Sequence, residues 1–210
     1  EALEQAGKTS MLVAKDGQVE GLIAVRDEPR EAARATIAAL KRQGVKRTVM
    51  LTGDNRRVAE AVGQELGIDE VHAELLPEDK VAQIEALQAR YGKVVMVGDG
   101  VNDAPAMASA DVGIAMGGAG TDVALETADI ALMADDLSKL PYAISLSRAS
   151  RRMIVQNLAI SLGVIALLVP SALLGLATIG IAIVLHESST LVVVANALRL
   201  LRFKPQTKAA

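Results

Sequence analysis

The chain has 210 residues, which is enough for one core of about 100–150 residues and a further segment. Apolar residues make up 51% of it and aromatic residues only 1%, so the core must be built from Ala, Val, Ile, Leu and Met. A formal net charge of −3 gives no sign of a nucleic-acid partner, and the absence of cysteine excludes disulfides and thiolate metal sites within these residues.

Residues 1–140 alternate short apolar runs with helical patterns, which favours repeated βα units and a parallel sheet. A strand is predicted over Val19–Val25, followed by a helix that begins near Pro29 and ends at Gly44. The next strand is predicted over Val45–Leu51. This part of the chain is therefore expected to be an α/β domain.

Two further helices and three further strands follow. The helices are predicted over Asn55–Leu66 and Pro77–Tyr91, each followed by a glycine that suits a helix end. The strands are predicted over Lys93–Val97, Val112–Ala115 and Ile130–Met133. The first of these strands is nearly all apolar, as a parallel strand covered on both faces should be.

Polar residues gather where two of the predicted strands end, and a lysine lies on the helix between them. Because polar groups of an open α/β sheet act from the carboxyl ends of its strands, these residues are expected to form one site. The set consists of Thr52, Gly53, Asp54, Lys80, Asp99, Asn102 and Asp103.

The chemistry of these groups matches phosphoryl transfer, which needs a divalent cation, a cationic side chain and hydrogen-bond donors to the phosphoryl oxygens. Asp99 and Asp103 offer the hard oxygen ligands that Mg²⁺ prefers. Lys80 would neutralise a phosphoryl oxygen, and Thr52 with the Gly53 amide would donate hydrogen bonds to it. Either acidic run alone is more typical of a turn, but their joint occurrence at strand ends favours a phosphoryl site.

Four stretches carry a family resemblance: "DEPREAA", "MLTGDN", "LLPEDK" and "MVGDGVNDAPAMASADVGIAMG". They resemble the phosphorylation domain of the P-type ATPases, a branch of the haloacid dehalogenase superfamily, and in particular the heavy-metal-transporting (P1B) class. The likeness extends from about Gly7 to Leu201. It implies an α/β, haloacid-dehalogenase-like parallel-sheet domain that uses ATP and Mg²⁺ through an aspartyl-phosphate.

The resemblance also implies a role for each polar residue of the set. Thr52, Gly53 and Asp54 match the family's Thr-Gly-Asp motif, whose threonine binds the phosphoryl group. Lys80 matches its phosphate-contacting lysine.

The remaining acidic and amide residues match in the same way. Asp99 matches the family's Mg²⁺ ligand, and Asn102 and Asp103 match the residues that orient phosphate and metal. Asp27 and Arg30 match the hinge between the nucleotide-binding and phosphorylation domains.

One departure from the family concerns the phosphorylated residue. The family is phosphorylated on the Asp of an Asp-Lys-Thr-Gly-Thr motif, which does not occur in this sequence. The chain is therefore expected to be a carboxyl-terminal fragment, inactive in isolation, whose partners include the upstream membrane helices and the rest of the nucleotide-binding domain. Residues 1–26 would end that domain, and residues 27–140 would form the phosphorylation domain.

The second half of the chain is membrane-like, because Met153–Leu185 contains no ionisable side chain. About 20 residues cross a ~30 Å hydrocarbon core, which predicts a two-helix transmembrane hairpin with spans at 154–174 and 179–201. Residues 141–153 would form a cytoplasmic linker helix and 202–210 a cytoplasmic tail. A buried core hairpin of a soluble protein is the alternative.

Positive charges flank this hairpin at both ends, which predicts a multi-pass protein of the cell membrane with its phosphorylation domain and carboxyl terminus in the cytoplasm. The cations are Arg148, Arg151, Arg152, Arg199, Arg202, Lys204 and Lys208.

The second span contains "LHESST", with ionisable groups at His186 and Glu187. Ionisable residues within a membrane span are candidate functional sites, and an imidazole with a carboxylate suits borderline divalent cations such as Co²⁺ or Zn²⁺. The segment resembles the His-Glu-Gly-Gly-Thr motif of the cobalt and divalent-cation subgroup, with Ser188 and Ser189 in place of the glycines. His186, Glu187 and Thr190 would then face the transported cation, unless the two ionisable groups only pair with polar groups of neighbouring helices.

The combined patterns predict ATP-driven export of a divalent heavy-metal cation of the Co/Zn/Cd type. Two alternatives remain: a non-catalytic truncated membrane protein with a regulatory or assembly role, and a membrane-anchored phosphatase of the same superfamily. The phosphatase would need an Asp-x-Asp motif, which the sequence lacks.

Overall fold

The computed structural model describes residues 8–25, 29–98, 101–116, 127–132 and 136–204. Contacts divide the chain into two compact units, Glu1–Pro141 and Tyr142–Ala210. The predicted site residue Asp99 and the predicted hinge residue Asp27 lie outside the described residues.

The first unit begins with an antiparallel hairpin of β1 (Thr9–Lys15) and β2 (Gln18–Val25). Strand β2 was predicted, but β1 was not. The hairpin turns at Asp16 and Gly17, whose φ angles of 51° and 80° are those of a two-residue turn that fits the twist of paired strands. Large apolar side chains of both strands are exposed: Met11, Leu12, Val13, Val19, Leu22, Ile23 and Val25.

The next two helices are α2 (Glu31–Arg42) and α3 (Arg56–Leu66). Asn55 caps α3, because its side-chain oxygen accepts a hydrogen bond from the Arg57 N–H at 2.9 Å. Gly67 ends the same helix with a φ of 73°, a left-handed conformation that glycine adopts without strain. Both helices lie where the sequence predicted them.

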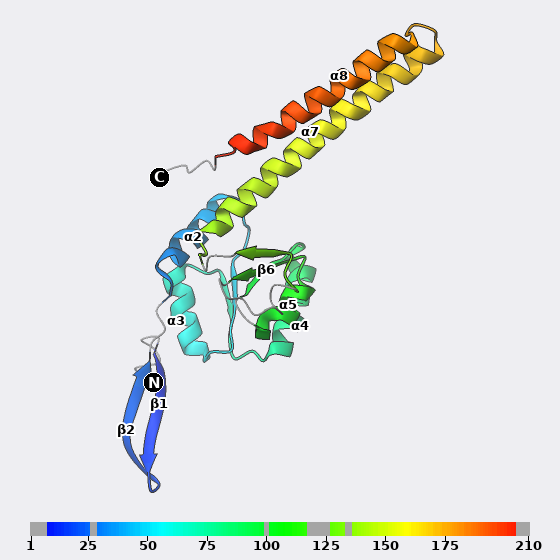
Figure 1. The fold of residues 1–210 in the computed structure, drawn as a ribbon. Coiled ribbons are helices and arrows are strands. Elements are labelled where there is room, and N and C mark those ends of the chain that lie inside the picture. Colours follow the sequence, from blue (N-terminus) through cyan, green and yellow to red (C-terminus); the bar gives the residue numbers. More distant parts are fainter. Residues whose placement is uncertain (1–7, 26–28, 99–100, 117–126, 133–135, 205–210) are drawn as a thin grey trace. The chain divides into compact units, whose positions relative to one another are not determined.

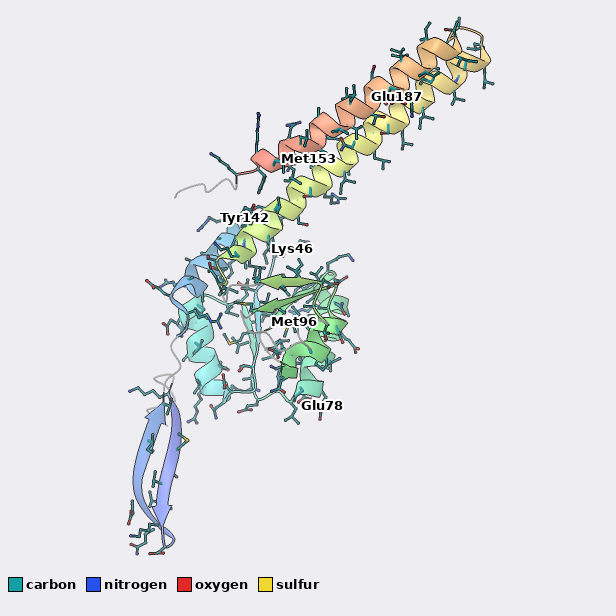
Figure 2. All side chains as sticks on the ribbon, viewed as in Figure 1. Lys46, Glu78, Met96, Tyr142, Met153 and Glu187 are labelled. Carbon is teal, nitrogen blue, oxygen red and sulfur yellow. The ribbon has the colours of Figure 1, made fainter. Side chains whose placement is uncertain are left out.

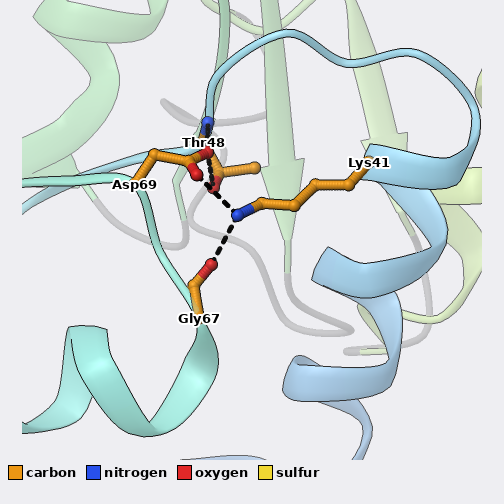
Figure 3. A network of polar contacts seen from close by, with 4 residues as sticks. All are labelled: Lys41, Thr48, Gly67 and Asp69. Carbon is orange, nitrogen blue, oxygen red and sulfur yellow. Dashed lines mark hydrogen bonds and ion pairs between the residues drawn. The ribbon is translucent and has the colours of Figure 1, made fainter.

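Strands β3 (Val49–Leu51) and β4 (Glu70–His72) are parallel neighbours. The prediction that the first of them starts at Val45 is wrong. The preceding residues are used differently: the Thr48 N–H donates to Asp69 Oδ2 at 2.8 Å, outside any strand ladder (Figure 3). The strand is therefore shorter than the apolar run suggested, and the residue before it is held by the side chain of Asp69.

The following segment matches its prediction closely. Helix α4 (Pro77–Tyr91) has the predicted bounds, and β5 (Val95–Gly98) follows it. A short 3₁₀ turn, η1 (Val101–Asp103), leads into α5 (Ala104–Ser109). Helix α3 lies on one side of the strands, and α4 and α5 lie on the other (Figure 1).

Strand β5 pairs in parallel with β6 (Val112–Met116), which pairs in parallel with β7 (Ile130–Leu132). The core of this unit lies between these strands and the helices α4 and α5, and Leu51 of β3 packs against it. Its buried members are Ile84, Met96, Ala104, Ala106, Met107 and Ala115. The core is aliphatic, as the composition required.

The second unit is a hairpin of two long helices, α7 (Lys139–Leu173) and α8 (Ile179–Leu198), followed by the 3₁₀ turn η2 (Arg199–Arg202) (Figure 1). Both helices are long and apolar enough to cross a membrane, with mean hydropathies of 2.1 and 1.7 and unburied apolar stretches. Helix α7 runs without interruption through the predicted linker and the predicted first span. The boundary between those two segments therefore stays a prediction.

Candidate functional site

Lys80 and Asp103, two residues of the predicted phosphoryl site, form an ion pair. Lys80 is in the first turn of α4 and its Nζ donates to Asp103 Oδ1 at 2.6 Å. The two side chains are only 15% and 16% exposed. A short, charge-assisted hydrogen bond of this kind keeps both charges paired in a partly dry environment. Among the described residues, nothing donates to the other oxygen, Oδ2 of Asp103.

Gly98, the last residue of β5, allows Asp103 to take this position. A Cβ atom at Gly98 would lie 2.7 Å from Asp103 Cβ and 3.0 Å from Asp103 Oδ2. The first of these distances is shorter than side chains tolerate, so a larger residue would push Asp103 away from the strand end. The glycine therefore positions the carboxylate of Asp103.

Thr52 and Asp54 form a second close pair at the end of β3. The Thr52 hydroxyl donates to Asp54 Oδ2 at 2.8 Å and accepts from the Asp54 N–H at 3.1 Å. The single hydroxyl proton is therefore used within the motif in this structure. For Thr52 to donate to a phosphoryl oxygen, its hydroxyl must turn away from Asp54.

A short loop connects the two pairs. The Leu75 N–H donates to the Thr52 carbonyl at 3.1 Å, and the Glu74 N–H donates to the Asp54 carbonyl at 3.0 Å. A Cβ atom at Gly53 would lie 3.3 Å from the Leu75 carbonyl oxygen, so the Thr-Gly-Asp turn packs closely on this loop. Helix α4 starts two residues later at Pro77 and carries Lys80, which links both halves of the site through the backbone.

Two further predicted residues, Asn102 and Arg30, lie outside the two pairs described above. Asn102 lies in η1 with an exposed side chain. Arg30, of the predicted hinge, precedes α2, and its carbonyl accepts from the Ala33 N–H at 2.8 Å. The structure thus brings Lys80 and Asp103 together, and the role predicted for each residue of the set stays a prediction.

The predicted cation site lies on α8, labelled at Glu187 in Figure 2. The helix is continuous through this segment. Ser189 and Thr190 both donate through their hydroxyls to the His186 carbonyl, at 2.7 and 3.3 Å. On a regular helix the side chains of His186 and Glu187 point about 100° apart.

His186 and Glu187 border an open apolar groove together with Ile165, Leu168 and Val169 of α7. The described residues contain no group of three or more His, Cys, Asp or Glu side chains that could hold a metal ion.

The contact between the two helices follows a regular spacing on α8. Half-buried residues recur at Ala182, Ser189, Val193 and Asn196, which is typical of a seam that faces one partner helix. His186, Glu187 and Thr190 are exposed instead.

Sequence reasoning missed a polar contact between the helices. Asn196 Nδ2 donates to Asn157 Oδ1 at 2.9 Å and to Gln156 Oε1 at 3.3 Å, and Arg199 donates to Asn196 Oδ1 at 2.9 Å. The available signal was the presence of amide side chains in otherwise apolar spans. Such residues join neighbouring helices in membranes.

Comparisons with known proteins agree with the fold. A sequence model described as haloacid dehalogenase-like hydrolase matches residues 1–111. A probable cadmium-transporting ATPase of Staphylococcus aureus is 48% identical over 202 residues, covering 96% of this chain and 25% of the relative. A probable cation-transporting ATPase G of Mycobacterium bovis is 50% identical over 203 residues, covering 97% and 26%.

Among solved structures, a zinc-transporting PIB-type ATPase in the E2.Pi state superposes with a TM-score of 0.84 at 48% identity. That match covers 96% of this chain and 33% of the solved chain. The chain thus spans about a quarter of the length of the two relatives and a third of the solved structure. The α/β phosphorylation-domain fold followed by two apolar helices is confirmed by these matches.

Proposed function

Because this chain belongs to the haloacid dehalogenase-like hydrolase family and, within it, to the heavy-metal-transporting P-type ATPases, we propose that it serves ATP-driven export of a divalent heavy-metal cation. It contributes the phosphoryl site and part of the cation pathway. The observation that carries the proposal is the Lys80–Asp103 pair at the end of β5, next to the Thr-Gly-Asp turn. The names of the relatives mention cadmium and zinc, two of the cations of the proposed Co/Zn/Cd type.

In the phosphoryl site, Asp103 and Asp99 would hold Mg²⁺, which when bound neutralises charge on the phosphoryl group. The residues fit such a hard cation, because Asp103 Oδ2 accepts no hydrogen bond from the described residues. Lys80 fixes the orientation of Asp103 and places a positive charge beside the phosphoryl oxygens. Thr52 and the Gly53 amide donate to these oxygens once the Thr52 hydroxyl turns from Asp54.

The phosphorylated aspartate belongs to an Asp-Lys-Thr-Gly-Thr motif that this sequence does not contain. We propose that a segment outside these 210 residues supplies it, together with most of the ATP-binding surface. The exposed apolar side chains of the β1–β2 hairpin support this, since they suit packing against further parts of a nucleotide-binding domain.

Helices α7 and α8 cross the membrane in this proposal, with the phosphoryl site and the carboxyl terminus in the cytoplasm. His186, Glu187 and Thr190 then face the cation pathway, and helices outside this chain complete the ligand set. The exposure of these three side chains supports that arrangement.

The proposal is tested by phosphorylation of the full-length pump with radiolabelled ATP. Asp103→Asn keeps the size of the side chain but removes its charge, and we expect the phosphoenzyme level to fall about a hundredfold. Asp16→Asn, in the β1–β2 turn, is the matched control and should leave the level unchanged. An Asp103→Asn pump that is phosphorylated normally would refute the role of this residue.

A further inference from the structure

The second unit carries its positive charges at one end. Between Tyr142 and Lys204 its one acidic residue is Glu187, which lies in the middle of α8. The cations lie instead in two segments, one early on α7 and one at the end of α8. They are Arg148, Arg151, Arg152, Arg199, Arg202 and Lys204.

Two contacts bring these segments alongside one another. Near the membrane side, Asn196 of α8 donates to Asn157 of α7 at 2.9 Å. Beyond η2, the ring of Phe203 lies 6.1 Å from the ring of Tyr142, tilted by 55°. Because these contacts bracket both basic segments, the arginines of α7 and η2 lie along the same stretch of the hairpin; Figure 2 labels Tyr142 and Met153 on its α7 side.

Four of the arginines in this stretch have no acidic partner among the described residues. The side chains of Arg151, Arg152, Arg199 and Arg202 are exposed, and none of them forms an ion pair with another part of the chain that the structure describes. Arg199 donates to the amide oxygen of Asn196, which is a neutral partner. The four guanidinium groups are therefore available to an anion.

The position of the cluster at a polar–apolar border identifies the anion. Immediately beyond the arginines the surface becomes apolar and exposed, at Ile154 and Val155 on α7 and at Leu198 on α8. Tyr142 and Phe203 lie on the other side of the arginines, and they are two of the chain's three aromatic residues. Aromatic and basic residues next to an apolar face are typical of the headgroup region of a bilayer.

We propose that Arg151, Arg152, Arg199 and Arg202 form a binding surface for the phosphate headgroups of anionic phospholipids. Guanidinium groups match phosphate in charge and in hydrogen-bond geometry, and basic residues next to a span attract anionic lipid. The surface selects lipids by headgroup charge. The inference rests on the proposed crossing of the membrane by α7 and α8.

The test uses this chain reconstituted in phosphatidylcholine vesicles with trace spin-labelled lipid. Electron paramagnetic resonance measures the fraction of label immobilised at the protein surface. We expect labelled phosphatidylglycerol to be immobilised about twofold more than labelled phosphatidylcholine, and this preference to shrink in high salt. Replacing the four arginines by glutamine should remove the preference, whereas replacing them by lysine should keep most of it.

The matched control removes the same charge elsewhere, with Lys15, Arg34, Lys46 and Arg56 of the first unit changed to glutamine. It should keep the preference. Equal immobilisation of the two lipids by the unchanged chain would overturn the proposal, as would a preference that survives in the arginine-to-glutamine variant. If neither lipid were immobilised, the proposed membrane crossing itself would fail.

Discussion

Asp103 accepts a hydrogen bond from Lys80 and packs against Gly98, and these two contacts fix its carboxylate where β5 ends. The sequence predicted one site that includes Lys80 and Asp103, and these two residues do meet, because a strand end and a helix start follow from apolar periodicity. It could not predict that Thr52 uses its hydroxyl proton on Asp54. Side-chain orientation within a turn depends on backbone geometry that a pattern of residue types does not contain.

The close packing of Gly98 predicts the effect of adding a single methyl group. Gly98→Ala would place a Cβ atom 2.7 Å from Asp103 Cβ, so Asp103 must move. In the full-length pump we expect phosphoenzyme formation to fall about tenfold or more, because displacement of about 1 Å misplaces a catalytic group. Gly21→Ala, which meets no atom within 4 Å, should have normal activity. Equal activity of both variants would contradict the positioning role of Gly98.

The lowered pKa of Asp69 predicts how acid changes the stability of the first unit. A hydrogen bond from Lys41, with further ones from Thr48, lowers the pKa of Asp69 from 3.8 to about 2, and Lys41 also donates to the Gly67 carbonyl at 2.7 Å (Figure 3). Because the folded-state pKa is depressed, the stabilisation is complete above pH 3.8 and is lost as the pH falls toward 2. Asp69→Asn should therefore lower the Tm at pH 6.

The Tm of the Asp69→Asn variant should approach the Tm of the unchanged chain as the pH falls from about 4 to about 2. Thermal unfolding of the detergent-solubilised chain, followed by circular dichroism, measures this difference. Glu60→Gln, an exposed change on α3, is the control and should keep the full pH dependence. A Tm difference for Asp69→Asn that stays constant down to pH 2 would contradict the assignment.

At the scale of elements, α2, α3, α4, β5, β6 and β7 were predicted close to their observed bounds, whereas β3 is shorter than predicted and no bounds were predicted for β4 and α5. The bounds of α4 match the prediction, because Pro77 and Gly92 mark its two ends. Strand β1 was missed, since its pairing with β2 depends on the turn at Asp16 and Gly17 and its side chains have no buried face in the described chain. The seam between α7 and α8 was missed because both helices are apolar on nearly all sides.

The amide contact between these helices yields a prediction about their association. Asn157→Leu and Asn196→Leu each remove the same 2.9 Å hydrogen bond. A double-mutant cycle on unfolding of the chain in detergent should give a coupling free energy of about 0.6 kcal/mol, the usual value for such bonds in membranes. Val155→Leu with Leu198→Val, both at exposed positions, is the control pair and should show no coupling. Additive effects of the two asparagine changes would show that the hydrogen bond does not stabilise the hairpin.

At the scale of the whole molecule, the sequence predicts an α/β domain up to residue 140 and a helical, mostly apolar segment after it, and contacts divide the chain after Pro141. The family could be predicted because its motifs are long and ordered along the chain. The cation could not be predicted, because the two ionisable residues of α8, His186 and Glu187, do not by themselves define a ligand set.

The central claim is that the phosphoryl site drives movement of a divalent cation past α8. The most direct test is ATP-dependent uptake of radioactive cadmium, zinc or cobalt into inside-out vesicles that contain the full-length pump. We expect uptake by the unchanged pump, and its loss in both Asp99→Asn and His186→Ala, whereas Val184→Ala should transport normally. Unchanged uptake by Asp99→Asn or His186→Ala, or no uptake of any of the three metals by the unchanged pump, would contradict the account.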